Sequence, residues 1–194
     1  MPGVISGIAL SGVFFFNPLN NQEEDAVLNE TRLMDKCLSH PTAFGFYHYH
    51  IASPCLKKQH GIASTSQIPD FCPDDPQCAK PNTKTFFVEK GYPVKKLEII
   101  GLAKDGHIIY GPYNKDGELW TCSDVDLCNG RFFDDGSYGY VATTTFPYTV
   151  GCFGPAPNMS TTAGPKCSIN SCFAVSMLSQ GVAAAVVAFV VAIF

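Results

Sequence analysis

Three sequence blocks occur twice in the same order, and this repetition constrains the fold more than any other feature of the chain. An apolar block, an aspartate-and-cysteine block and an aromatic block recur at offsets of 94, 91 and 91 residues. The first copies lie at 7–18, 34–37 and 45–50, and the second copies at 101–112, 125–128 and 136–141. Three ordered matches are difficult to obtain by chance. We therefore interpret the chain as an internal duplication whose halves share one core.

Short runs rich in aromatic and β-branched residues indicate strands within each copy. The Asp105-Gly106 pair predicts a tight hairpin turn, and the matching first block is therefore predicted to be a hairpin as well. A helical period occurs only over 23–33. The strands are expected at 5–10, 13–16, 46–52, 85–89, 97–103, 107–110, 138–143 and 148–153.

The predicted fold class is mainly β: an internally duplicated (pseudo-twofold) antiparallel β domain with long disulfide-stapled loops, plus a C-terminal hydrophobic tail. The domain is expected to span residues 1–157. Copy one covers 4–63, a proline-rich linker covers 64–84, and copy two covers 85–157. A polar stalk over 158–170 would connect the domain to the tail.

The tail has the pattern of a lipid-anchor attachment signal. An apolar run over 181–194 is shorter than the ~20 residues needed to span a bilayer. Small residues at 170–172 and the spacer 173–180 precede it, as in a glycosylphosphatidylinositol signal. We expect removal of 171–194 and lipid attachment at Asn170, with Ser171 or Ser168 as alternates. A tail-anchored span and a buried helix are the alternatives.

The cysteines favour an extracellular compartment. Cleavage after Asn170 would remove Cys172 and leave an even number of cysteines, with no C-x-x-C pair of the kind found in zinc sites. Structural disulfides typical of secreted proteins are expected, and repeat symmetry suggests the pairs Cys37–Cys55 and Cys128–Cys152. The remaining predicted disulfide cysteines are Cys72, Cys78, Cys122 and Cys167.

Two glycosylation sequons, at Asn29 and Asn158, agree with the extracellular face of the plasma membrane. The apolar run over 4–16 resembles part of a signal peptide, but no basic residue precedes it and it matches the hairpin block. We therefore expect the leader of this secretory protein to be missing from the chain. A net charge of -4, with scattered basic residues, argues against a nucleic-acid partner.

The candidate chemistry lies in the aromatic block of copy one. His48 and His50 are two residues apart, so on a strand they share one face. Two such imidazoles can bind a transition metal with a third ligand, for which His40, Asp35 and His107 are candidates. Nitrogen ligands suit Zn or Cu better than Ca or Mg. The alternative is a surface strand whose imidazoles only form hydrogen bonds or stack on tyrosines.

An ordered set of motifs resembles the YHYH-domain protein family. The set comprises His40-Pro41-Thr42, 45–50, Pro54-Cys55, Asp105-Gly106, 109–112, 126–130 and 146–152. The resemblance covers about residues 5–154 and implies no settled activity. Two departures stand out. The second aromatic strand, 138–141, carries no histidine, and Leu38 and Ser39 precede His40 where the family usually has glycine. Copy two is therefore expected to be structural only.

Two functional hypotheses follow. One is a noncatalytic, lipid-anchored surface module that binds a metal or a partner, and the other is a metal-dependent secreted enzyme that uses the same histidine face. An open pocket over that face would favour the enzyme, and a filled face would favour the module. The signatures G-x-S-x-G, H-E-x-x-H, G-x-G-x-x-G and the P-loop are absent from the sequence. The partner, whether protein or small molecule, is not identified by the sequence.

Overall fold

The structure is a computed structural model that describes residues 3–35, 37–56, 92 and 95–157. Several sequence predictions fall outside these residues: the linker, the strand at 85–89, the stalk and the tail. The same is true of the residues Cys72, Cys78, Cys167, Asn158 and Asn170. Within the described residues, no helix is long and apolar enough to cross a membrane.

The described chain is mainly β, as predicted, and forms one open sheet in the order β3-β4-β2-β1-β5-β6-β8-β7. Two short helical segments, α1 (Ala26–Asn29) and η1 (Thr31–Leu33), lie between β2 and β3. The strands are β1 (Ile5–Ala9), β2 (Phe14–Phe16), β3 (Ser39–Pro41), β4 (Tyr47–Tyr49), β5 (Ile99–Ala103), β6 (Ile108–Tyr110), β7 (Gly130–Phe132) and β8 (Tyr138–Val141).

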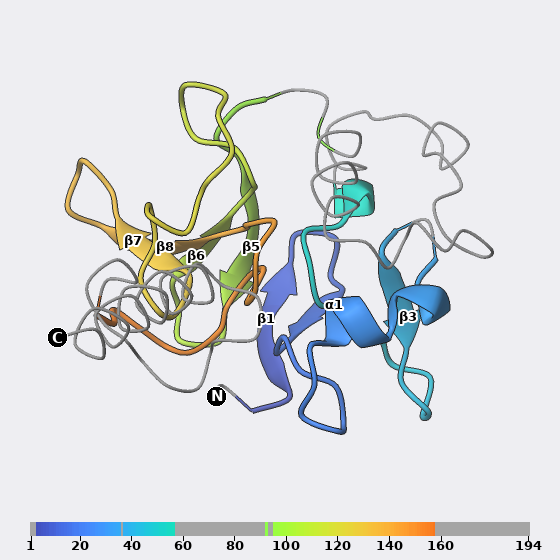
Figure 1. Ribbon diagram of the computed structural model, residues 1–194. Helices are drawn as coiled ribbons and strands as arrows, with labels where there is room; N and C mark the ends of the chain where they lie inside the picture. The colour runs from blue at the N-terminus through green and yellow to red at the C-terminus, as the bar shows by residue number, and fades with distance from the viewer. Residues whose placement is uncertain (1–2, 36, 57–91, 93–94, 158–194) are drawn as a thin grey trace, which may run out of the picture.

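The two halves of the sheet have matching strand orders. From the centre outward, β1, β2, β4 and β3 of the first half correspond to β5, β6, β8 and β7 of the second. Strands β1 and β5 pair antiparallel where the halves meet, and Figure 1 shows them side by side between α1 and β3 on one side and β6–β8 on the other. This order is what an internal duplication requires, although the duplication itself stays an interpretation of the sequence.

The sheet is mixed, whereas the sequence analysis predicted an antiparallel sheet. Strand β2 pairs parallel with β4, and β6 pairs parallel with β8, whereas the other pairs are antiparallel. Parallel neighbours need a crossover of a dozen or more residues. The segment 17–46, which carries α1, η1 and β3, supplies that crossover in the first half.

Glycines permit both the hairpin turns and the contact between halves. Gly12 and Gly106 adopt φ values of +84° and +92° at the two hairpin turns, a region that favours glycine. At the centre of the sheet, a Cβ atom on Gly7 would lie 2.7 Å from the Leu102 carbonyl oxygen. Any larger residue at this position would therefore push β1 away from β5.

One hydrophobic core joins the halves. Phe15 and Tyr49 of the first half, and Ile109 and Tyr140 of the second, are buried in the same cluster. These residues occupy corresponding positions in the two sequence copies. The shared core confirms that neither half of the described sheet packs as an independent unit.

Both disulfide pairings suggested by symmetry are present. Cys37 bonds to Cys55 and Cys128 to Cys152, with Cα–Cα separations of 5.2 and 4.5 Å. Cys122 is also disulfide-bonded. Each of the two described disulfides connects the loop before an outer strand to the segment after the aromatic strand.

Three local predictions were wrong. The segment 148–153 is not a strand, because Tyr148 adopts a φ of +65° and its N–H donates to the Thr145 carbonyl in a turn. The helix expected over 23–33 begins only after Asp25, because Glu23 adopts a φ of +61°. The outer strands β3 and β7, of three residues each, were not predicted.

Candidate metal centre

Strands β3 and β4 bring three histidines together. In the antiparallel register between these strands, His40 lies directly opposite His48. His50 follows β4 immediately and lies on the same side as His48, as strand alternation predicted. The three residues are 6%, 3% and 3% exposed, respectively. Pairing of the two strands therefore turns distant sequence positions into one buried imidazole cluster.

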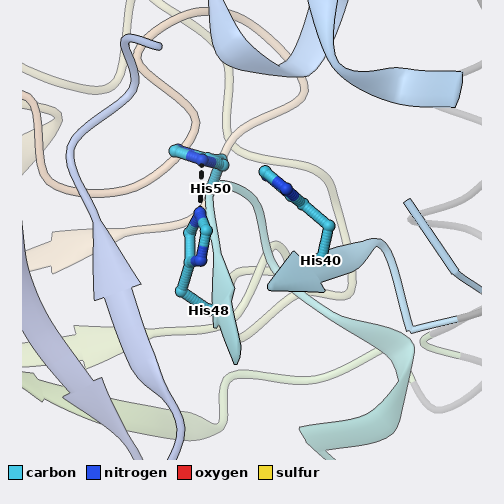
Figure 2. A group of neighbouring side chains, drawn as sticks. All are labelled: His40, His48 and His50. Carbon is cyan, nitrogen blue, oxygen red and sulfur yellow. Dashed lines mark hydrogen bonds between the residues drawn. The ribbon is translucent and has the colours of Figure 1, made fainter. Parts of the chain in front are cut away.

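The ring nitrogens of the cluster converge on one point. The Nε2 atoms of His48 and His50 lie 3.0 Å apart, and the candidate ligand atoms of all three histidines lie within 4.8 Å of one another. Figure 2 shows the His40 ring directed toward the other two rings. Two ligands at ~2.0–2.1 Å from a tetrahedral zinc ion would be about 3.3 Å apart. The separation between His48 and His50 is therefore close to the distance between two ligands of such an ion.

Backbone carbonyls hold two of the rings by their other nitrogens. His48 Nδ1 lies 3.0 Å from the Phe46 carbonyl oxygen, and His50 Nδ1 lies 2.7 Å from the Asn17 carbonyl oxygen. A carbonyl only accepts hydrogen bonds, so each Nδ1 carries the proton and each neutral ring presents a lone pair at Nε2. This is the arrangement that metal-bound histidines commonly adopt.

Burial favours the neutral, ligand-competent form of all three rings. Desolvation lowers the pKa of His40 and His48, opposed by the carbonyls of Pro41 and Phe46 respectively. Desolvation, together with the neighbouring imidazoles and against the opposing effect of the Asn17 carbonyl, lowers the pKa of His50 to about 3. Two neutral imidazoles whose Nε2 lone pairs face each other at 3.0 Å repel one another. A cation between them would remove that repulsion.

Phe16 fixes the orientation of the rings. Its ring stacks on His48 with centroids 3.9 Å apart, and its edge faces His50 at 6.2 Å. The aromatic side chain covers one side of the cluster with apolar surface. Packing of an apolar side chain against the ligands of a metal site orients them and limits the access of water.

A carboxylate that the sequence analysis missed lies beside the cluster. Glu30 Oε2 lies 3.2 Å from His40 Nε2 and 3.6 Å from His50 Nε2, and its side chain is 21% exposed. Desolvation raises the pKa of Glu30, an effect opposed by the nearby His48. No local pattern connects Glu30 to the histidines. The one available signal was its place within the helical period over 23–33.

The comparisons with known proteins identify the family. The family model described as YHYH protein matches residues 3–119, more than half of the chain. The chain belongs to the YHYH protein family. No curated protein and no solved structure matched it. The matched part of this YHYH chain contains β1–β6 and all three clustered histidines, but it ends before β7 and β8.

The other ligand candidates of this YHYH protein are engaged elsewhere. Asp35 accepts hydrogen bonds from the Tyr47 hydroxyl at 2.6 Å and from Cys37 N at 2.8 Å. These bonds hold the loop before β3, which is a structural task. His107 lies in the second half, where its Nδ1 is 3.1 Å from Asp105 Oδ2. The structure therefore brings neither residue into the cluster, and His40 is the one of the three candidates for the third ligand that lies beside the strand histidines.

The corresponding position in the second half holds no imidazole. Arg131 and Gly139 are opposite each other in the β7–β8 register, where the first half has His40 and His48. Aromatic side chains fill the space: a Cβ atom on Gly139 would lie 3.0 Å from the Tyr110 ring and 3.2 Å from the Phe133 ring. The same backbone arrangement thus carries polar chemistry in one half and aromatic packing in the other.

Proposed function

We propose that this YHYH-family protein is a lipid-anchored surface module on the outer face of the plasma membrane that binds Zn or Cu through His40, His48 and His50. The observation that carries the metal role is the convergence of three buried imidazoles, two of which have their Nδ1 atoms held by carbonyls. The donor set of several imidazoles suits these ions better than Ca or Mg.

The enclosure of the histidines supports a noncatalytic role over an enzyme. A catalytic metal needs an open coordination position that a substrate can reach. The three rings are almost fully buried, and Phe16 covers one side of them. Two hollows on the described surface lie in the second half, and neither is lined by these histidines. The cluster is therefore shaped to hold an ion more than to expose it.

The chemistry of the loops supports the extracellular location. The disulfides Cys37–Cys55 and Cys128–Cys152 form and persist in oxidising compartments. Asn29 of the first sequon is exposed, as an acceptor of a glycan must be. The predicted C-terminal lipid signal would then attach the domain to the membrane surface.

Metal analysis of the purified full chain tests the metal role. About one equivalent of Zn or Cu should remain bound after dialysis, and the His48→Ala/His50→Ala double variant should lose it. His107→Ala is the matched control, since it removes an imidazole that lies with Asp105 in the other half. A wild-type protein that binds neither ion, or a double variant that binds as much as the wild type, would contradict the proposal.

A further inference from the structure

We infer that the Glu30 carboxylate is the fourth ligand of this metal site, so that the bound ion is four-coordinate with three nitrogens and one oxygen. This inference rests on the proposed function, because it assigns a ligand to the same site. It concerns a residue outside the aromatic and histidine motifs and 10 positions before the first clustered histidine.

The backbone around Glu30 is held on both sides. Its N–H donates to the Ala26 carbonyl at 2.8 Å as the C-cap of α1, and its own carbonyl accepts from Leu33 N at 2.8 Å. At the other end of the helix, the Asp25 side chain accepts from Leu28 N at 3.1 Å. The Glu30 side chain is therefore attached to an ordered turn beside the histidines.

The distances from Glu30 match ligand-to-ligand separations. Its Oε2 lies 3.2 and 3.6 Å from the Nε2 atoms of His40 and His50, on either side of the ~3.3 Å expected around a tetrahedral ion. His40 Nε2 is buried and has no hydrogen-bond partner, even though Glu30 Oε2 is so near. The two atoms therefore do not form an ordinary hydrogen bond. The Nε2 atom of His40 is therefore available to bind a metal ion.

Charge gives the carboxylate a further reason to bind. Three neutral imidazoles leave a divalent ion with its full charge in a buried site, where an uncompensated charge is costly. One carboxylate halves that charge. In the described part of the chain, Glu30 is the carboxylate that lies within 4 Å of ring nitrogens of the three clustered histidines. Because its side chain is more exposed than the imidazoles, a ligand from solvent would enter the site by displacing Glu30.

Cobalt(II) added to the metal-free full chain tests the assignment. Four-coordinate Co(II) absorbs visible light far more strongly than six-coordinate Co(II), so the wild-type protein should develop a strong visible band. Glu30→Gln keeps the size of the side chain and leaves the Asn29 sequon intact. It should weaken Co(II) binding by at least about tenfold in a chelator competition and change the band. Glu118→Gln removes one carboxylate at an exposed site in the second half, and should behave as the wild type does.

The possible results separate the two proposals. If Glu30→Gln binds Co(II) with wild-type affinity and spectrum, the Glu30 assignment is overturned and the histidine site stands. If the wild type binds neither Zn nor Cu, the proposed function fails, and the Glu30 assignment, which rests on it, fails as well. Should the variant not fold, anomalous diffraction from Zn-loaded wild-type crystals decides the matter. Glu30 Oε2 at about 2.0–2.2 Å from the ion supports the assignment, and a water in that place overturns it.

Discussion

A hydrogen bond between two buried side chains connects the helix before the metal cluster to the second half of the chain. The Tyr148 hydroxyl donates to Asp25 Oδ2 at 2.6 Å, across 123 sequence positions. Asp25 is also the N-cap of α1, the helix whose C-cap is Glu30. Burial, together with the Asp25 charge, raises the pKa of Tyr148, so its hydroxyl stays protonated and keeps donating at neutral pH.

Tyr148→Phe is expected to lower the free energy of unfolding by about 1.5–3 kcal/mol, the range for a hydrogen bond to a charged group. The ring itself stays in place. The loss of unfolding free energy therefore comes from removal of the hydroxyl, which leaves the buried Asp25 carboxylate with one hydrogen-bond donor fewer. Urea unfolding with the disulfides intact, followed by circular dichroism, measures the difference.

A double-mutant cycle with Asp25→Ala separates this pair from the other roles of each residue. The interaction energy should account for most of the effect of Tyr148→Phe, because the second change removes the acceptor. A Tyr148→Phe protein within about 0.5 kcal/mol of the wild type would refute the reasoning, since half a kcal/mol is the usual size of a surface change. A cycle with no interaction energy would refute it equally.

Three further predictions follow from the same contacts. Tyr138→Phe should destabilise the protein more than Tyr47→Phe. The reason is that Tyr138 donates to the buried Asp126, whereas Tyr47 donates to the exposed Asp35. Equal losses of unfolding free energy in urea would contradict this prediction. The metal-free protein should lose stability as the pH falls from about 6.5 toward 3. In this range His50 becomes protonated in the unfolded chain but stays neutral in the folded protein, where its pKa is about 3. That loss is ~2 kcal/mol at pH 5 for His50 alone, and a urea midpoint that rises on acidification would exclude it. Finally, a phosphatidylinositol-specific phospholipase should release the protein from membranes, and a mature product that retains the C-terminal peptide would end the lipid-anchor prediction.

The sequence was a good guide wherever local chemistry decides the structure. The Asp105-Gly106 pair predicted one hairpin, and the matching block of the first copy predicted the other, because few residues tolerate the left-handed conformation that such turns require. The pairings Cys37–Cys55 and Cys128–Cys152 followed from symmetry, because corresponding cysteines flank corresponding strands. The side shared by His48 and His50 followed from the period of a strand.

The sequence was a poor guide wherever distant contacts decide the structure. β3 and β7 are three residues long and include Pro41 and Gly130, which individually disfavour strands. They form because the aromatic strand beside each one pairs with them. The segment 148–153 has the composition of a strand, but Tyr148 lies in a turn with a φ of +65°, and its hydroxyl donates to the distant Asp25. Glu30 was missed for the same reason, because only tertiary packing brings it to the histidines.

The second half also indicates how a bound metal would affect the stability and the strand order of the sheet. Its β6, β8 and β7 strands repeat the pairings of β2, β4 and β3, with Arg131 and Gly139 in the register positions of two cluster histidines. That half therefore builds the arrangement from aromatic packing and a disulfide, with no imidazole at these positions. The first half has the same core contacts and its own disulfide. Since the backbone arrangement does not depend on imidazoles, a metal bound at His40, His48 and His50 would add stability to a sheet that already forms, and its loss would leave the strand order unchanged.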